Sequence, residues 1–201
     1  MFTWCPMDYN VDTTDFAKEL ESVPHDYWYY DKHRNTEVLF LYHPGGTIKN
    51  FDATLKENLD WTEATNFCPN LKSFLEEIVS EFPGKIAVLR TKPGIEMNVH
   101  LDSYIEELGT NQYKWRMVIK GDRKNFYFLD ENEEKVYPNQ QEYQSYIMDG
   151  LHPHGIDVSN EEKMTITLGA PWRGSPLPKN LLLGQEIKIN KPVLKNIWEC
   201  R

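Results

Sequence analysis

Residues 85–102 read KIAVLRTKPGIEMNVHLD, and this stretch decides the fold expected for the chain. Apolar and β-branched side chains dominate 85–91 and 95–101, which is typical of strands in a pleated sheet. The residues at 92–94 (KPG) lie between them, and a Pro-Gly pair marks a tight turn. The pattern therefore predicts two consecutive strands joined by a short connection.

Strands, turns and two helices are expected on both sides of this stretch. Apolar side chains recur at helical spacing over 71–79, which predicts a helix with Asn70 as its N-cap. A shorter helix is expected at 16–20. Further strands are expected at 37–42, 113–119, 125–129, 143–148 and 164–168. Short strands separated by polar turns favour an antiparallel sandwich or barrel with helices packed outside it.

His100 and Asp102 form a possible metal-binding pair at the end of the quoted stretch. Side chains at i and i+2 of a strand point to the same face, so this pair faces one side and Leu101 the other. His152 and His154 follow about fifty residues later, which leaves room for several strands to bring them close. Two histidines and one carboxylate leave about half of an octahedral Fe(II) coordination sphere open. A structural zinc site is usually closed and richer in cysteine.

The composition is that of a folded, acidic protein. Of the 201 residues 40% are apolar and 26% are charged, and the formal net charge is −9. We expect neither a nucleic acid nor an anionic membrane as a partner, because proteins bind both of these mainly through clustered Lys and Arg residues. No apolar run approaches the roughly 18 residues of a membrane span, and no signal peptide is expected over 1–10. Cys5, Cys68 and Cys200 form no CxxC pair, which indicates the reduced thiols of a cytoplasmic protein.

Residues 85–102 resemble the iron-binding segment of Fe(II)/2-oxoglutarate-dependent oxygenases, and most of all that of the aspartyl/asparaginyl β-hydroxylase branch. Residues 154–168 resemble the distal segment of the same family, in which a histidine precedes a turn and a basic residue begins the returning strand. The resemblance covers about 75–172 and implies a mainly β fold with flanking helices, a double-stranded β-helix (jelly roll, cupin-like). We expect one domain over 1–201, with the jelly-roll core at about 84–172, a mixed α/β N-terminal elaboration and a C-terminal strap.

The resemblance also implies the metal ligands and the cofactors. His100 and Asp102 match the proximal pair of ligands. His154 is expected as the distal ligand in preference to His152, because Lys163 follows it by nine positions, a gap that suits the family's co-substrate anchor. The implied cofactors are Fe(II) and 2-oxoglutarate, with O2 as the other co-substrate.

Two basic residues are the main candidates for the anchor of 2-oxoglutarate. The family usually places arginine in the returning strand, where this chain has Lys163. Lysine neutralises a carboxylate as a point charge rather than as a two-pronged fork. Arg116 lies in an otherwise apolar strand, where a buried guanidinium needs an anionic partner. Arg90 and Arg173 are weaker candidates for the same role.

The function implied by the resemblance is hydroxylation of an unactivated C–H bond in an amino-acid side chain, free or within a peptide, coupled to decarboxylation of 2-oxoglutarate to succinate. Two alternatives stay open at this point. One is a cupin-like metal enzyme that does not use 2-oxoglutarate, and the other is a jelly-roll binding protein without catalysis. The sequence carries no Gly-rich phosphate loop, no GxSxG and no HExxH motif.

Overall fold

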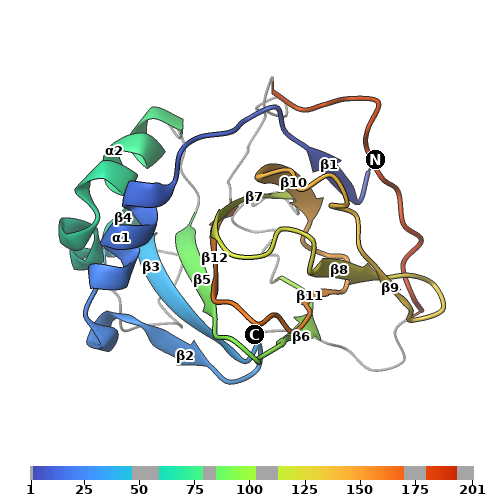
Figure 1. Ribbon diagram of the computed structural model, residues 1–201, viewed down its shortest axis with the longest axis horizontal. Helices are drawn as coiled ribbons and strands as arrows, with labels where there is room; N and C mark the ends of the chain where they lie inside the picture. The colour runs from blue at the N-terminus through green and yellow to red at the C-terminus, as the bar shows by residue number, and fades with distance from the viewer. Residues whose placement is uncertain (1, 47–58, 79–84, 103–112, 170–179, 194–201) are drawn as a thin grey trace.

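The computed structural model describes residues 2–46, 59–78, 85–102, 113–169 and 180–193, and it consists mainly of two antiparallel sheets (Figure 1). The larger sheet has the order β1 (Trp4–Pro6), β10 (Ser145–Asp149), β7 (Tyr113–Lys120), β12 (Lys163–Gly169), β5 (Ile86–Thr91), β3 (Thr36–Pro44), β2 (Tyr29–Asp31), and β4 (Leu59–Trp61) also pairs with β3. The smaller sheet has the order β6 (Met97–His100), β11 (His154–Ile156), β8 (Phe126–Leu129), β9 (Lys135–Val136).

From β5 onward the chain crosses repeatedly from one sheet to the other. Strands β5, β7, β10 and β12 belong to the larger sheet, and the strands between them in the sequence belong to the smaller one. This winding is that of a double-stranded β-helix, so the expected jelly-roll fold is confirmed.

Two helices, α1 (Thr14–Ser22) and α2 (Pro69–Ile78), lie beside the larger sheet, at the left of Figure 1. Their fully buried leucines, among them Leu20 and Leu75, belong to one apolar cluster with side chains of β5, β7 and β12. Full burial of each leucine contributes roughly 1.5–3 kcal/mol to folding. The helices therefore cover the outer face of the sheet and leave its inner face for the interior of the jelly roll.

The inner faces of the two sheets enclose a second apolar cluster. Alternation along β7 places Trp115 and Met117 in the outer cluster and Val118 in the inner one, together with Phe126 and Phe128 of β8. Arg116 has the same parity as Val118, so its side chain enters the jelly roll. This alternation brings a charged side chain into the interior of the jelly roll, and the candidate site lies around it.

Residues of the C-terminal segment run along the edge strand β1. Isolated bridges join Trp4 to Ile187 and Met7 to Leu181.

Cys5 and Cys68 are buried free thiols, and burial raises their pKa values to about 11 and about 12. Among the helices of the described ranges, none has the length and apolar character that crossing a membrane requires.

Candidate metal centre

The structure brings His100, Asp102 and His154 together between β6 and β11. His100 is the last residue of β6, and it lies opposite His154 in the register of the two strands. Asp102 follows just after the strand, where its backbone N–H donates to the carbonyl of Gly150 at 2.8 Å. Strand pairing thus joins two segments that are far apart in the sequence.

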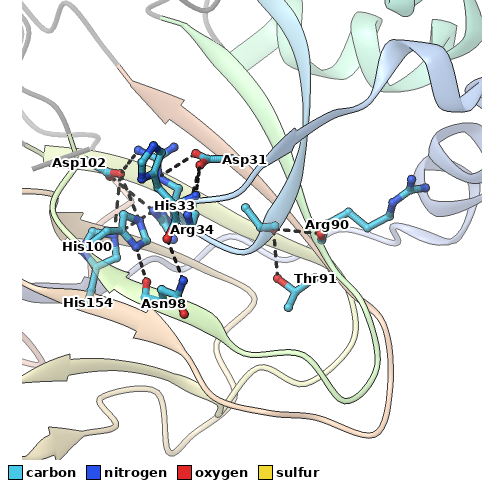
Figure 2. A network of polar contacts seen from close by, with 11 residues as sticks. Asp31, His33, Arg34, Arg90, Thr91, Asn98, His100, Asp102 and His154 are labelled. Carbon is cyan, nitrogen blue, oxygen red and sulfur yellow. Dashed lines mark hydrogen bonds and ion pairs between the residues drawn. The ribbon is translucent and has the colours of Figure 1, made fainter. Parts of the chain in front are cut away.

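The three side chains offer one ligand atom each, and these atoms all lie within 4.8 Å of one another (Figure 2). Asp102 Oδ1 is 3.7 Å from His100 Nε2 and 3.9 Å from His154 Nε2. All three residues are buried. The same carboxylate oxygen therefore faces both imidazole rings, which is the arrangement of a facial set of metal ligands.

Backbone carbonyls orient both imidazole rings. His100 Nδ1 lies 2.8 Å from the carbonyl oxygen of Asn98, and His154 Nδ1 lies 2.7 Å from that of His152. A carbonyl only accepts, so each Nδ1 carries the proton and each Nε2 keeps its lone pair. Such partners on the far nitrogen fix the tautomer and the orientation of metal-binding histidines.

The protonation states of the three residues also suit a metal. Burial lowers the pKa of His154 to about 3 and lowers the pKa of His100 well below its ordinary value. Burial alone would raise the pKa of Asp102, but His154, Arg116 and Arg34 outweigh it and hold that pKa below its usual range. At neutral pH the group therefore consists of two neutral imidazoles and one carboxylate.

Arg116 of β7 reaches the same group from the larger sheet. Its Nη2 lies 3.5 Å from Asp102 Oδ2 and 3.3 Å from His154 Nε2, and its side chain is 1% exposed. Among the described residues, Arg116 Nε and Nη1 have no hydrogen-bond partner, and neither do the hydroxyls of Thr165 and Thr167. Thr167 lies opposite Arg116 in the register of β12 and β7. Unpaired polar groups gathered in one buried place indicate a binding site for a polar ligand.

Lys163, at the start of β12, is a second buried cation in the interior. It is 2% exposed, and its Nζ donates to Asn125 Oδ1 at 2.6 Å. Burial lowers the pKa of Lys163 to about 7, although the charge of Asp122 opposes this effect. The structure thus places both candidates for the anchor inside the jelly roll.

The alternative candidates lie elsewhere. The His152 Nε2 atom is 2.7 Å from the carbonyl oxygen of Leu129, and the residue is not part of the convergent group. Arg90 pairs with Glu37 at 2.7 Å, and its guanidinium stacks 3.8 Å from the ring of Trp28. Arg173 lies outside the described residues.

Arg34 also belongs to the site, although the sequence around it does not indicate this. Its Nη2 lies 3.4 Å from Asp102 Oδ1, and its side chain is 14% exposed. It belongs to the turn between β2 and β3, which is far from the ligand strands in the sequence. The acidic turn residue Asp31 lies 3.8 Å from its Nε, but no sequence motif marks the pair.

No protein-family model matches the chain, and no curated protein matches its sequence. Solved structures do match its fold. A prolyl-4-hydroxylase from Pseudomonas putida is 11% identical with a TM-score of 0.51, over 85% of this chain and 92% of that one. A prolyl hydroxylase from Trichoplax adhaerens, solved with a hypoxia-inducible-factor peptide fragment, is 10% identical with a TM-score of 0.53, over 88% of this chain and 89% of that one.

The chain shares the fold of these prolyl hydroxylases. This similarity agrees with the jelly roll that the strand order shows. The narrower resemblance, to the aspartyl/asparaginyl β-hydroxylase branch, stays a prediction.

The donor set fits Fe(II). Imidazole nitrogen and carboxylate oxygen are both suitable ligands for this ion, and three donors on one side leave positions for other ligands. His100 Nε2 is buried and, among the described residues, has no hydrogen-bond partner. A metal ion would occupy that lone pair. The hydrogen-bonding groups of Arg116, Thr165 and Thr167 that have no partner within the described ranges would suit a small dicarboxylate close to the metal.

Proposed function

We propose that the protein is an Fe(II)/2-oxoglutarate-dependent dioxygenase that hydroxylates an unactivated C–H bond of an amino-acid or peptidyl side chain. His100, Asp102 and His154 would hold the metal. The observation that carries the proposal is the shared tautomer of the two histidines, since both Nδ1 atoms face carbonyls and both Nε2 atoms face Asp102 Oδ1. Two histidines that served only to pack the core would not need to turn their Nε2 atoms toward the same carboxylate oxygen.

Two buried cations support the use of 2-oxoglutarate. Lys163 would neutralise the distal carboxylate of the co-substrate, and Arg116 would add a charge close to the metal. In the described part of the chain Arg116 pairs with the carboxylate of Asp102 and Lys163 with the neutral amide of Asn125, so a dianionic ligand would offset the cost of burying both groups. A cupin-like metal enzyme that uses no 2-oxoglutarate, or a binding protein without catalysis, would give no reason for both cations inside the jelly roll.

Bound Fe(II) and 2-oxoglutarate supply the oxidising chemistry, in which O2 is reduced, 2-oxoglutarate becomes succinate and CO2, and one oxygen atom enters the substrate. The chain supplies position and surroundings. The backbone of Asn98 and His152 fixes the rings, while Arg116 and Arg34 keep Asp102 ionised. The aromatic ring of Phe126, which belongs to the inner apolar cluster, packs 5.7 Å from that of His154.

Succinate release from 2-oxoglutarate, with Fe(II) and ascorbate, tests the reaction. We expect slow turnover without substrate in the wild-type protein and none in His100→Ala or Asp102→Ala. Binding of Mn(II), followed by electron paramagnetic resonance, gives a second readout, and both variants should lose it.

His152→Ala is the matched control for His154→Ala. His152 holds the neighbouring ring through its backbone carbonyl, which the substitution keeps, and its own side chain contacts Leu129 instead. We expect Mn(II) binding in His152→Ala and none in His154→Ala. The proposal is wrong if His100→Ala and Asp102→Ala both retain metal binding and succinate release.

A further inference from the structure

The turn between β2 and β3 is docked onto the strand that carries His100. Asn98 N donates to the carbonyl of Arg34 at 3.0 Å, and Asn98 Nδ2 donates to that of His33 at 2.9 Å. From the other side, Asn35 Nδ2 donates to the carbonyl of Glu96 at 3.1 Å. Figure 2 shows Arg34 of this turn next to Asp102. The backbone of the N-terminal hairpin is therefore held in place beside the metal centre.

The turn also has its own internal support. Asp31 Oδ1 accepts hydrogen bonds from the backbone N–H of His33 at 2.9 Å and of Arg34 at 3.2 Å. Asn35 has φ 57°, a left-handed conformation that asparagine tolerates better than most residues. These contacts fix the backbone of Arg34 beside β6, so its side chain has a defined position next to the metal centre.

The guanidinium of Arg34 interacts with the oxygen that a metal would use. Asp102 Oδ1 faces both histidine Nε2 atoms, and Arg34 Nη2 lies 3.4 Å from that same oxygen. Arg34 Nε has no hydrogen-bond partner among the described residues. A metal ion bound to Asp102 Oδ1 would use the lone pair of that oxygen, which would weaken its interaction with Arg34. The guanidinium of Arg34 has five N–H donors, and some of them would then need another acceptor. This step rests on the proposed function.

The charges around Asp102 leave room for another anion. Arg34, Lys114 and Arg116 all act on this carboxylate electrostatically, and Asp31 is the other carboxylate of the cluster. Alternation along β7 places Lys114 on the same face as Arg116. Lys114 forms no ion pair in the described part of the chain. The cluster thus has three cationic side chains and two carboxylates. The formal charges of Fe(II) and the 2-oxoglutarate dianion cancel, so the cluster keeps its excess of positive charge when both are bound.

We propose that Arg34 binds a carboxylate of the primary substrate, which is therefore a carboxylic acid. Guanidinium binds a carboxylate through two parallel hydrogen bonds, which fixes orientation as well as affinity. A substrate carboxylate held at the β2–β3 turn would present the neighbouring C–H bonds to the metal. The carboxylate belongs either to a free amino acid or to an acidic side chain within a peptide.

The test uses ¹³C-labelled acetate as a bare carboxylate and the protein loaded with Mn(II) and saturating 2-oxoglutarate under nitrogen. Mn(II) accelerates the relaxation of nearby nuclei, so acetate bound at Arg34 should show enhanced ¹³C relaxation. We expect at least a tenfold smaller enhancement in Arg34→Gln and an intermediate one in Arg34→Lys. Lys32→Gln removes a charge from an exposed position of the same turn and should leave the enhancement unchanged.

Two further probes distinguish the sources of the carboxylate. Glycine represents the α-carboxylate of a free amino acid, and the N-acetyl amide of aspartate represents an acidic side chain within a peptide. The probe with the stronger relaxation enhancement identifies the source, and acetamide should show none.

An absent enhancement with acetate would overturn the proposal. So would an enhancement that is unchanged in Arg34→Gln, because the acetate would then lie on the metal itself. Failure of the wild-type protein to bind Mn(II) would instead contradict the proposed function, and paramagnetic resonance of the ion detects that outcome separately.

Discussion

His100 and His154 lie opposite each other on β6 and β11, and each holds its Nδ1 atom against the backbone carbonyl two residues before it. The two hydrogen bonds, of 2.8 and 2.7 Å, are equivalent, although the residues come from different strands. Because the backbone rather than a side chain orients both rings, their direction depends on the pairing of the two strands. Changes that alter this pairing should therefore alter the metal centre, even at residues that are not ligands.

The affinity for 2-oxoglutarate should depend on pH through Lys163. Burial lowers its pKa to about 7, so the group is cationic below pH 7 and increasingly neutral above it. A carboxylate binds the cationic form, so the apparent Kd for 2-oxoglutarate should rise above pH 7, by up to about tenfold per pH unit. Titration calorimetry in two buffers of different ionisation enthalpy measures both the affinity and the uptake of the proton.

Lys163→Arg is the matched variant for this prediction. Arginine stays protonated throughout the range, so the affinity of the variant should be nearly independent of pH between 6 and 9. Lys163→Met should bind 2-oxoglutarate weakly at every pH. A wild-type affinity that is flat across pH 7 would show that Lys163 is not the anchor.

Thr167 should contribute to ligand binding and not to stability. Its buried hydroxyl has no hydrogen-bond partner among the described residues, so Thr167→Val should leave the free energy of unfolding unchanged or higher by about 1 kcal/mol. The same change should raise the KM for 2-oxoglutarate severalfold, if the hydroxyl faces the co-substrate beside Arg116. Urea unfolding and the succinate assay measure the two effects.

Thr62→Val is the control for Thr167→Val. The hydroxyl of Thr62 is also buried, but it donates to the carbonyl of Phe40 at 2.6 Å. The valine would remove this hydrogen bond to a buried carbonyl, so the variant should lose about 0.5–1.5 kcal/mol of stability. Equal losses in the two variants would mean that the hydroxyl of Thr167 has a structural partner after all.

The sequence was sufficient to predict the longer strands and the common face of His100 and Asp102, because both depend on local pattern. Alternation placed His100 and Asp102 on one face, and β5, β7 and β12 lie within two residues of the ranges expected for them. The strand β11 was not predicted, because its three residues, His154–Ile156, include a glycine and are too short for a periodic pattern. Its pairing with β6 on one side and β8 on the other defines it.

The errors come from contacts between distant segments. Asn70 was expected as an N-cap, but α2 begins at Pro69, and the carboxylate of Glu19 accepts the backbone N–H groups of Asn70 and Leu71 at 3.0 Å each. That cap is supplied by α1 and cannot be read from the α2 sequence. Arg34 was missed for the same reason, since only the docking of its turn on β6 brings it to Asp102.

Gly155 should be essential for the spacing of the two ligand strands. A Cβ atom at this position would lie 2.6 Å from Tyr127 Oη and 2.9 Å from the backbone oxygen of Met97 in β6. The tyrosine could move, but the backbone of β6 could move only together with His100. Gly155→Ala should therefore lose about 1–3 kcal/mol of stability, as expected for overpacking, and should bind Mn(II) at least tenfold more weakly.

Gly94→Ala separates this effect from the general cost of replacing a glycine. Gly94 has φ +74°, so alanine is strained there by roughly 1–2 kcal/mol, but nothing lies within 4 Å of the added Cβ. Urea unfolding should show a loss of stability in both variants, whereas Mn(II) titration should show weaker binding in Gly155→Ala alone. Normal Mn(II) affinity in Gly155→Ala would show that the distance between β6 and β11 does not control the ligand geometry, and the backbone-oriented pair of histidines would then lose its proposed role.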